Sequence, residues 1–336
     1  MPCDSRQRAD LAAGNVLITG AGGFLGSHLV DRYLADGAAV VGIDNYLTGS
    51  PANLKAAGEN PSFVFIRANV SEDWDSIVET LASRGITPQL ILHFASPASP
   101  VDYAEHPLET MAVNSAGTQN ALEAALRWNA RFLFASTSEC YGDPLEHPQR
   151  ESYWGNVNSF GPRSCYDESK RFGEALTYSY IQQSNVDARV IRIFNTYGPR
   201  MRLNDGRVVP NFIMQALRGE PLTVFGTGSQ TRSFCYVDDL VEGIVRCAAS
   251  ERTRGVVVNL GNPEEHAISE FAQIVCRVVG VPLKIVETAL PVDDPGRRCP
   301  DITRARDFLD WEPEVSLDEG LRRTIDYFRA RATTGA

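Results

Sequence analysis

The fold is decided by the stretch Val16-Leu-Ile-Thr-Gly20-Ala-Gly-Gly23-Phe-Leu-Gly26. A short apolar run of strand type ends there at a glycine-rich turn, and a helical pattern follows over residues 25–36. Glycines let the backbone turn tightly and approach a pyrophosphate, to which the first amides of the helix can donate. The order of strand, glycine turn and helix therefore predicts a dinucleotide-binding fold.

The next apolar run ends at Asp44, which sets the choice of dinucleotide. Its carboxylate can accept the hydroxyl groups of an adenosine ribose and would repel a 2′-phosphate. The loop Asp44-Asn-Tyr-Leu-Thr-Gly-Ser50 contains no lysine or arginine that could bind such a phosphate. The sequence therefore favours NAD over NADP. The residues expected to hold NAD from this half of the chain are Gly20, Gly23, Phe24, Leu25, Gly26, Asp44, Asn45, Tyr46, Thr48, Gly49, Asn69, Val70, Phe94, Ala95 and Ser96.

Short apolar runs continue to alternate with helical patterns, which is typical of a parallel sheet covered on both faces. Predicted strands cover residues 16–19, 40–44, 63–67, 90–94, 132–136, 189–194 and 256–260. Predicted helices cover residues 25–36, 108–128, 166–184 and 237–249. This order predicts an α/β fold with a doubly wound parallel (Rossmann) sheet.

After Asn195 the alternation gives way to loops rich in glycine, proline and arginine. We expect a smaller C-terminal lobe there, closing over the carboxyl edge of the sheet, where ligands of such folds bind. The two domains are predicted to be interleaved. Residues 14–196 plus 236–261 are expected to form the NAD-binding Rossmann domain, and residues 197–235 plus 262–330 the substrate-binding lobe.

Composition indicates a soluble globular protein, with 336 residues of which 43% are hydrophobic and 22% charged. The formal net charge of −10 provides no general positive field for a nucleic acid backbone, so nucleic acid is not an expected partner. The first ten residues lack an apolar signal core, and no apolar run approaches the roughly 18 residues of a membrane span. We therefore expect a cytoplasmic protein with no membrane partner.

The seven cysteines are predicted to be free thiols. Their number is odd, no Cys-x-x-Cys pair occurs, and no histidines cluster beside them in the sequence. These features argue against both a disulfide framework and a zinc site. No metal is therefore expected.

A candidate catalytic pair lies in Tyr166-Asp-Glu-Ser-Lys170, downstream of the predicted strand 132–136. Residues four apart on a helix lie on one face, so the Lys170 ammonium can approach the phenol and lower its pKa from about 10. The phenol would then serve as a general base. Pairs with this spacing also occur on ordinary solvated helices, so the glycine turn upstream is what favours a catalytic interpretation.

Longer stretches carry a family resemblance that extends from Val16 to Phe328. They are His93-Phe-Ala-Ser-Pro-Ala-Ser-Pro100, Ala135-Ser-Thr-Ser-Glu-Cys-Tyr-Gly-Asp-Pro144, Tyr153-Trp-Gly-Asn156, Gly161-Pro-Arg-Ser-Cys-Tyr-Asp-Glu-Ser-Lys170, Phe194-Asn-Thr-Tyr-Gly-Pro-Arg-Met201 and Asp293-Asp-Pro-Gly-Arg-Arg-Cys-Pro-Asp301. With these stretches in this order, the chain resembles the extended short-chain dehydrogenase/reductases. Within them it is similar to the UDP-glucuronate decarboxylases, also called UDP-xylose synthases.

The resemblance implies a closed redox cycle on UDP-glucuronate. Tyr166, assisted by Lys170, takes the proton of the sugar 4-hydroxyl while NAD accepts the hydride from C4. The resulting 4-keto uronate is a β-keto acid, so carbon dioxide can leave with its electrons held as an enolate, without a metal. Protonation at C5 and return of the hydride then give UDP-xylose and restore NAD.

The resemblance also implies roles for the residues around the sugar. Thr137 would bind O4, Glu139 would position substrate and water, and Arg298 would handle the carboxylate and deliver a proton or water. Ser138 stands where 4,6-dehydratases carry an acidic aspartate, which disfavours dehydration. The remaining implied NAD contacts are Asn114, Ala135 and Thr196, beside Tyr166 and Lys170. The implied substrate contacts are Pro97, Tyr103, Glu139, Asn195, Val209, Asn211, Thr223, Phe225, Gln230, Arg232 and Arg298, with Asn195 and Arg232 at the diphosphate.

Four departures from the family pattern leave the product open. Ala112 stands where relatives tend to have a lysine near the substrate, Cys140 where valine is usual, Cys299 where lysine is usual and Ser50 where a basic residue often follows the glycine. A variant of the reaction would release part or most of the product as UDP-4-keto-pentose with NADH. A 4,6-dehydratase, a 4-epimerase and a non-enzymatic NAD sensor are further alternatives, although such sensors usually lack the tyrosine and lysine pair.

By analogy with the family we expect a homodimer. Its four-helix interface would use the predicted helices 108–128 and 166–184 of each copy.

Overall fold

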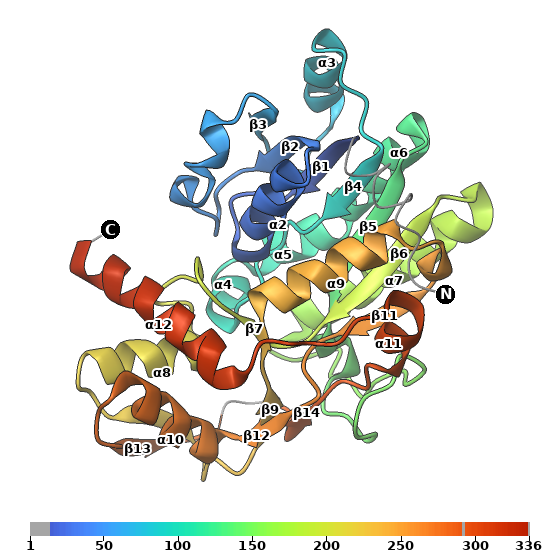
Figure 1. Ribbon diagram of the computed structural model, residues 1–336. Helices are drawn as coiled ribbons and strands as arrows, with labels where there is room; N and C mark the ends of the chain where they lie inside the picture. The colour runs from blue at the N-terminus through green and yellow to red at the C-terminus, as the bar shows by residue number, and fades with distance from the viewer. Residues whose placement is uncertain (1–13, 291–292, 335–336) are drawn as a thin grey trace.

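The structure, a computed structural model, describes residues 14–290 and 293–334 and arranges them around one central sheet (Figure 1). Seven parallel strands lie in the order β11-β6-β5-β4-β1-β2-β3. Their bounds are β1 (Asn15–Thr19), β2 (Ala39–Asp44), β3 (Phe63–Arg67), β4 (Leu90–His93), β5 (Arg131–Thr137), β6 (Ala188–Ile193) and β11 (Val257–Leu260). The predicted doubly wound parallel sheet is confirmed, with each predicted strand within two residues of its observed bounds.

Helices cover both faces of the sheet because successive strand side chains point to opposite sides. Val16 and Ile18 of β1 belong to one apolar core and Leu17 to the other. The first core includes residues of α2 (Phe24–Ala35) and α9 (Val237–Ala249). Helices on the second face are α3 (Asp75–Ser83), α5 (Pro107–Asn114), α6 (Ala116–Trp128) and α7 (Ser164–Ser184).

The single helix predicted over residues 108–128 is wrong, because α5 and α6 are separate helices. Ser115 lies between them with φ −107° and ψ −81°, outside helical geometry. Its hydroxyl donates to the Met111 carbonyl at 2.6 Å, a local bond that competes with regular helix geometry. Both helices contact α7, and α6 also packs on β4 and β5.

The second lobe lies below the sheet in Figure 1 and packs around aromatic side chains. Phe234 stacks on Phe271 with ring centroids 4.2 Å apart. The main elements here are α8 (Val208–Leu217), β8 (Leu222–Phe225), β9 (Thr231–Ser233), β12 (Glu265–Ala267), α10 (Ile268–Val279), β13 (Ile285–Thr288), β14 (Arg297–Arg298) and α12 (Leu317–Thr334). The residue boundaries given above for the two domains stay a prediction.

The smaller elements connect these layers. They are η1 (Pro51–Leu54), η2 (Ala57–Glu59), α4 (Pro100–Glu105), η3 (Ser138–Tyr141), β7 (Thr196–Tyr197), β10 (Cys235–Tyr236), η4 (Glu251–Thr253) and α11 (Thr303–Leu309). β7 and β10 pair in parallel. They carry the chain out of the central sheet and back to α9.

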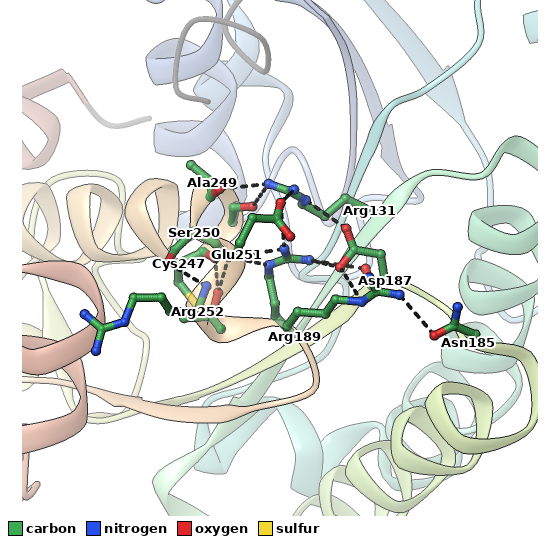
Figure 2. A network of polar contacts seen from close by, with 12 residues as sticks. Arg131, Asn185, Asp187, Arg189, Cys247, Ala249, Ser250, Glu251 and Arg252 are labelled. Atoms are coloured by element: carbon green, nitrogen blue, oxygen red, sulfur yellow. Dashed lines mark hydrogen bonds and ion pairs between the residues drawn. The ribbon is translucent and has the colours of Figure 1, made fainter. Parts of the chain in front are cut away.

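A buried polar network fastens α9 and η4 to the amino ends of β5 and β6 (Figure 2). The Arg189 side chain is fully buried, and its guanidinium donates to Asp187 at 2.7 Å and to the Ser250 carbonyl at 3.2 Å. Arg131 donates to the Ala249 carbonyl at 2.9 Å and pairs with Asp187 and Glu251. These bonds lie at the edge of the sheet opposite its carboxyl ends, so we assign them to stability.

Among the residues that the structure describes, no helix is both long enough and apolar enough to span a membrane.

Candidate active site

One large cavity of about 1170 Å³ opens between the carboxyl ends of the strands and the second lobe. Residues at the ends of β1 to β6 form one wall, and residues of α8, β8 and β9 form the other. Most predicted NAD and substrate residues line this cavity. The three that do not are Tyr46, Asn114 and Arg298.

The glycine turn forms a cradle at one end of the cavity. Gly20 has φ +72°, and a Cβ there would lie 2.7 Å from the Ala95 backbone nitrogen. A Cβ on Gly26 would lie 1.9 Å from the Gly20 carbonyl oxygen. Helix α2 begins directly after Gly23, so no N-cap side chain covers its first amides. The cradle therefore fits a pyrophosphate bound close to the backbone at a helix N-terminus.

Asp44 lies beside this cradle at the end of β2. It accepts hydrogen bonds from the backbone amides of Gly22 at 2.8 Å and Tyr46 at 2.6 Å. Burial raises the pKa of Asp44, while these amide bonds oppose the shift. The carboxylate lines the cavity, where a ribose would meet it. The Tyr46 ring stacks on Phe65 with ring centroids 5.1 Å apart, and its expected contact with NAD stays a prediction.

Replacing Asp44 with alanine is expected to weaken NAD binding by about 10- to 100-fold, since a hydrogen bond to a charged group contributes roughly 1.5–3 kcal/mol. Binding of NADP should fall less, because the repulsion of its 2′-phosphate disappears as well. Fluorescence titrations with both cofactors measure the two constants. Asp36→Ala, which removes an exposed ion pair with Arg32, is the matched control. An unchanged preference for NAD over NADP would contradict this assignment.

The catalytic pair lies where β5 ends and α7 begins. Tyr166 is buried and stacks on Tyr103, with ring centroids 5.1 Å apart and planes at 9°. Lys170 is also buried, and its ammonium donates to the Ala135 carbonyl at 2.9 Å. The ammonium nitrogen lies 5.9 Å from the centre of the Tyr166 ring. Both side chains line the cavity, as the spacing predicts.

The expected lowering of the Tyr166 pKa by Lys170 is wrong for this structure. Burial raises the pKa of Tyr166, while a hydrogen bond with Thr137 opposes the shift. Burial also lowers the pKa of Lys170 to about 7, so its charge is itself disfavoured. Burial sets the direction of both pKa shifts, which spacing on a helix does not reveal.

The low pKa of Lys170 predicts a specific dependence of stability on pH. The pKa falls from its ordinary 10.5 to about 7 on folding, so the folded protein binds fewer protons than the unfolded chain between these values. The free energy of unfolding should therefore rise with pH across that window. In Lys170→Met this rise is absent. Urea unfolding without NAD, at about pH 6.5 and about pH 9, measures the free energy of unfolding of the parent and of Lys170→Met. If the free energies of the two proteins differ by the same amount at both pH values, the lowered pKa of Lys170 is contradicted.

An ionic cluster forms the wall next to Tyr166. Glu139 pairs with Arg163 at 2.6 Å and with Arg298. Burial disfavours the charge on Glu139, but the two guanidinium groups outweigh it and lower its pKa to about 2. Glu139 therefore lines the cavity as an ionised carboxylate that two arginines hold in place.

Arg298 lies behind this wall rather than in it. It is 1% exposed and donates to the Ser138 hydroxyl at 3.3 Å, to Glu139 and to the Gly142 carbonyl at 3.0 Å. In this position Arg298 holds Glu139, and its expected direct contact with a sugar carboxylate stays a prediction. Thr137, Ser138 and Glu139 do line the cavity as predicted.

Asn114 is the third predicted residue outside the cavity wall. It is fully buried and donates to the Ser169 hydroxyl at 3.0 Å, which joins α5 to α7. Its expected contact with NAD stays a prediction.

The far wall of the cavity carries the remaining predicted substrate residues. Arg232 lines the cavity and pairs with Asp294 at 3.0 Å. Gln230 donates to the Phe225 carbonyl at 2.9 Å, and Thr223 contacts Gln215. Also on the cavity wall are Pro97, Tyr103, Asn195, Val209 and Asn211.

The sequence analysis missed nine charged residues of the wall, namely Asp102, Glu109, Arg163, Arg200, Arg202, Asp205, Arg207, Asp294 and Arg331. Arg163 and Asp294 lie inside stretches that carry the family resemblance, so their place in the sequence could have marked them as candidate site residues. Among the departures, Ala112 lines the cavity, whereas Cys140 and Cys299 do not.

This cavity, with a dinucleotide cradle at one end and a tyrosine and lysine pair beside it, defines the class of protein. The sequence model of the NAD dependent epimerase/dehydratase family matches residues 16–261, so the chain belongs to that family. Within it, the chain belongs to the UDP-glucuronic acid decarboxylases. UDP-glucuronic acid decarboxylase 1 of Xenopus tropicalis is 50% identical over 94% of this chain and 72% of the relative. UDP-glucuronic acid decarboxylase 4 of Arabidopsis thaliana is 50% identical over 94% of this chain and 69% of the relative.

Solved structures agree with this class. UDP-glucuronic acid 4-epimerase from Bacillus cereus, solved with UDP-glucuronic acid and NAD, is 29% identical. It has a TM-score of 0.84, covering 94% of this chain and 99% of that chain. DesIV, a dTDP-glucose 4,6-dehydratase from Streptomyces venezuelae with NAD bound, is 26% identical with a TM-score of 0.85, covering 95% of this chain and 98% of that chain.

Proposed function

We propose that this chain decarboxylates UDP-glucuronate to UDP-xylose through a UDP-4-keto intermediate, using NAD. The observation that carries the proposal is that Thr137, Ser138, Glu139 and Tyr166 line the same cavity as the glycine cradle. Family membership supplies the substrate, since the decarboxylase relatives are half identical over most of the chain. When bound, NAD supplies a hydride acceptor at C4 and then returns the hydride.

NAD would lie along the carboxyl edge of the sheet. The cradle of Gly20, Gly23 and Gly26 would hold the pyrophosphate, and Asp44 would bind the adenosine ribose. The walls near Ala95, Ser96 and Lys170 would hold the second ribose and the nicotinamide. These residues fit the cofactor because the glycine cradle leaves no room for a side chain.

Tyr166 would take the proton from the sugar O4, and Thr137 would hold that oxygen. Burial raises the pKa of Tyr166, so the phenol keeps its proton before ligands bind and must lose it before it can accept one from O4. Carbon dioxide then leaves the 4-keto uronate, and the C6 bonding pair passes into an enolate over C5, C4 and O4. A proton added at C5 completes the exchange of carboxyl for hydrogen.

Glu139 and its arginines would shape the part of the cavity around C5. The guanidinium of Arg163 lines the cavity and can face the sugar carboxylate, while Arg298 keeps Glu139 in place. Ser138 lies where a dehydratase needs an acid, and a hydroxyl cannot protonate a leaving hydroxide well. The wall therefore supports loss of carbon dioxide over loss of water.

One observation favours a partial release of UDP-4-keto-pentose with NADH. Ala112 lines the cavity at the position where relatives tend to carry a lysine. Without that cation the neutral keto intermediate would have fewer polar contacts during the second hydride transfer. The ratio of UDP-xylose to released UDP-4-keto-pentose would therefore depend on the residue at position 112.

We also propose that two copies associate through α5, α6 and α7. Leu108, Met111, Phe172 and Tyr178 expose large apolar side chains on α5 and α7. The predicted four-helix interface would cover them. A cytoplasmic location stays a prediction of the sequence.

Incubation with NAD and one sugar nucleotide at a time tests the proposed substrate. UDP-glucuronate should release carbon dioxide, and UDP-glucose, which has no carboxylate, should not. Gas release is measured with substrate labelled at C6. Binding of UDP-glucuronate without any loss of carbon dioxide would contradict the proposed function and favour an epimerase.

A further inference from the structure

Three side chains of metal-ligating type meet at one edge of the second lobe. His147, Glu265 and Cys299 each offer one ligand atom, and these atoms all lie within 4.8 Å of one another. Within residues 14–290 and 293–334, only these three side chains form such a group. Nε2 of His147 lies 3.0 Å from a carboxylate oxygen of Glu265, 118 residues away in the sequence. The arrangement thus exists only in the folded chain, so cysteine spacing gave no sign of it.

The backbone holds the three residues in place from separate directions. The Gln149 amide donates to the Cys299 carbonyl at 2.9 Å, and the Cys299 amide donates to the Gln149 side-chain oxygen at 2.8 Å. Glu265 pairs with Ser233 in the ladder of β12 and β9. β14, which directly precedes Cys299, pairs with β9 as well. One small sheet therefore preorganises the site.

Solvent can reach the group, and its chemistry suits a borderline metal. The side chains of His147 and Glu265 are 29% and 23% exposed, whereas Cys299 lies beneath them at 4%. Zinc binds nitrogen and oxygen at about 2.0 Å and thiolate at about 2.3 Å, so its ligand atoms lie roughly 3–4 Å apart. A small side-chain shift brings the three atoms to those distances. Burial, together with the carboxylates of Glu265 and Asp301, raises the pKa of Cys299 to about 11, and a cation would reverse that effect.

We propose that His147, Glu265 and Cys299 bind one Zn²⁺, with water as the fourth ligand. The ion would take the position between Nε2 of His147 and the Glu265 carboxylate, and the thiol proton that Cys299 now directs at the Pro263 carbonyl would leave to solvent. Thr231 donates to the other Glu265 oxygen and would orient the carboxylate. The ring proton of His147 moves to Nδ1, so its 3.5 Å contact with the Gln149 amide nitrogen is given up.

The ion would fasten three segments that surround Arg298. It joins the loop before Pro148, the start of β12 and the residue that follows β14. Because Arg298 holds Glu139, zinc would stabilise the wall of the cavity from outside it. This role is independent of the substrate, so the site stands or falls separately from the proposed reaction.

Titration of the full-length, chelator-treated protein with Co²⁺ and Zn²⁺ tests the site. We expect one Co²⁺ per chain with a thiolate-to-cobalt charge-transfer band, and Zn²⁺ should displace it. Zinc at about 100 times its dissociation constant should raise the unfolding midpoint by about 3 °C or more. Cys299→Ser should lose the band, and His147→Gln should lower the Zn²⁺ affinity at least tenfold. His147 is partly exposed, so the second variant should keep the fold.

One matched control lies on helix α10, and the other lies next to Glu265 on β12. Cys276→Ser in α10 removes another buried thiol, and His266→Gln removes the neighbouring histidine, which lies near Glu264 and Glu270. Both should bind Co²⁺ like the parent protein. Equal Zn²⁺ binding by the parent, Cys299→Ser and His147→Gln would mean an adventitious ion only and would overturn the proposal.

Discussion

Tyr166→Phe is expected to lower the rate of carbon dioxide release by about 10³-fold, because a positioned acid or base contributes roughly 10²–10⁴. The phenol is the group that exchanges a proton with O4, and no step after that exchange can begin without it. Phenylalanine keeps the ring that stacks on Tyr103, so the cavity wall should persist. Affinity for NAD should therefore stay within a few-fold of the parent, while NADH formation in a single turnover is lost.

Tyr178→Phe is the matched control for that prediction. Tyr178 lies on the same helix α7 but is 63% exposed, and it does not line the cavity. Its variant should release carbon dioxide at the parental rate. If Tyr166→Phe retained more than about a tenth of the parental rate, the phenol would not be the acid and base of this site.

Glu139→Gln is expected to reduce both stability and turnover. The substitution leaves Arg298, which is almost fully buried, without its carboxylate partner. Breaking a buried ion pair by removing one partner costs about 3–5 kcal/mol. The amide also cannot position substrate and water as the carboxylate would, so carbon dioxide release should fall by about 10²-fold or more. Urea unfolding and initial rates measure the two effects separately.

Glu174→Gln separates a loss of stability from a loss of catalysis. Glu174 pairs with Arg192 at 2.7 Å, and both side chains are nearly buried, but Glu174 does not line the cavity. Its variant should lose comparable stability and still turn over at close to the parental rate while folded. Equal losses of rate in the two variants would show that Glu139 acts only through the fold.

The sheet could be predicted from the sequence because its signals are local. The glycine turn and the strand ending at Asp44 fixed the first βαβ unit, and both apolar runs are long enough to form buried strands. The break at Ser115 was missed because a serine within an amphipathic pattern is compatible with a continuous helix. The break becomes visible only in the structure, where the dihedral angles of Ser115 leave helical geometry and Asn114 bonds to Ser169 of α7.

The sequence could predict which segments of the backbone meet at the candidate site. It could not predict the directions in which individual side chains point. Resemblance brought Thr137, Glu139 and Tyr166 to one cavity wall, as expected. It did not reveal that Arg298 points behind that wall, since β14 sets the direction of its side chain. The shifted pKa values of Tyr166 and Lys170 depend on burial, which spacing along a helix does not contain.

The most direct test of the account is a mass-resolved time course of the purified protein with UDP-glucuronate and NAD, following NADH absorbance in the same sample. We expect a product lighter by the mass of carbon dioxide, identified as UDP-xylose, with NADH returning to its starting level. A keto-pentose with equimolar NADH would instead mean that release outruns the second hydride transfer. A product with the mass of the substrate, or no product, would contradict the decarboxylation.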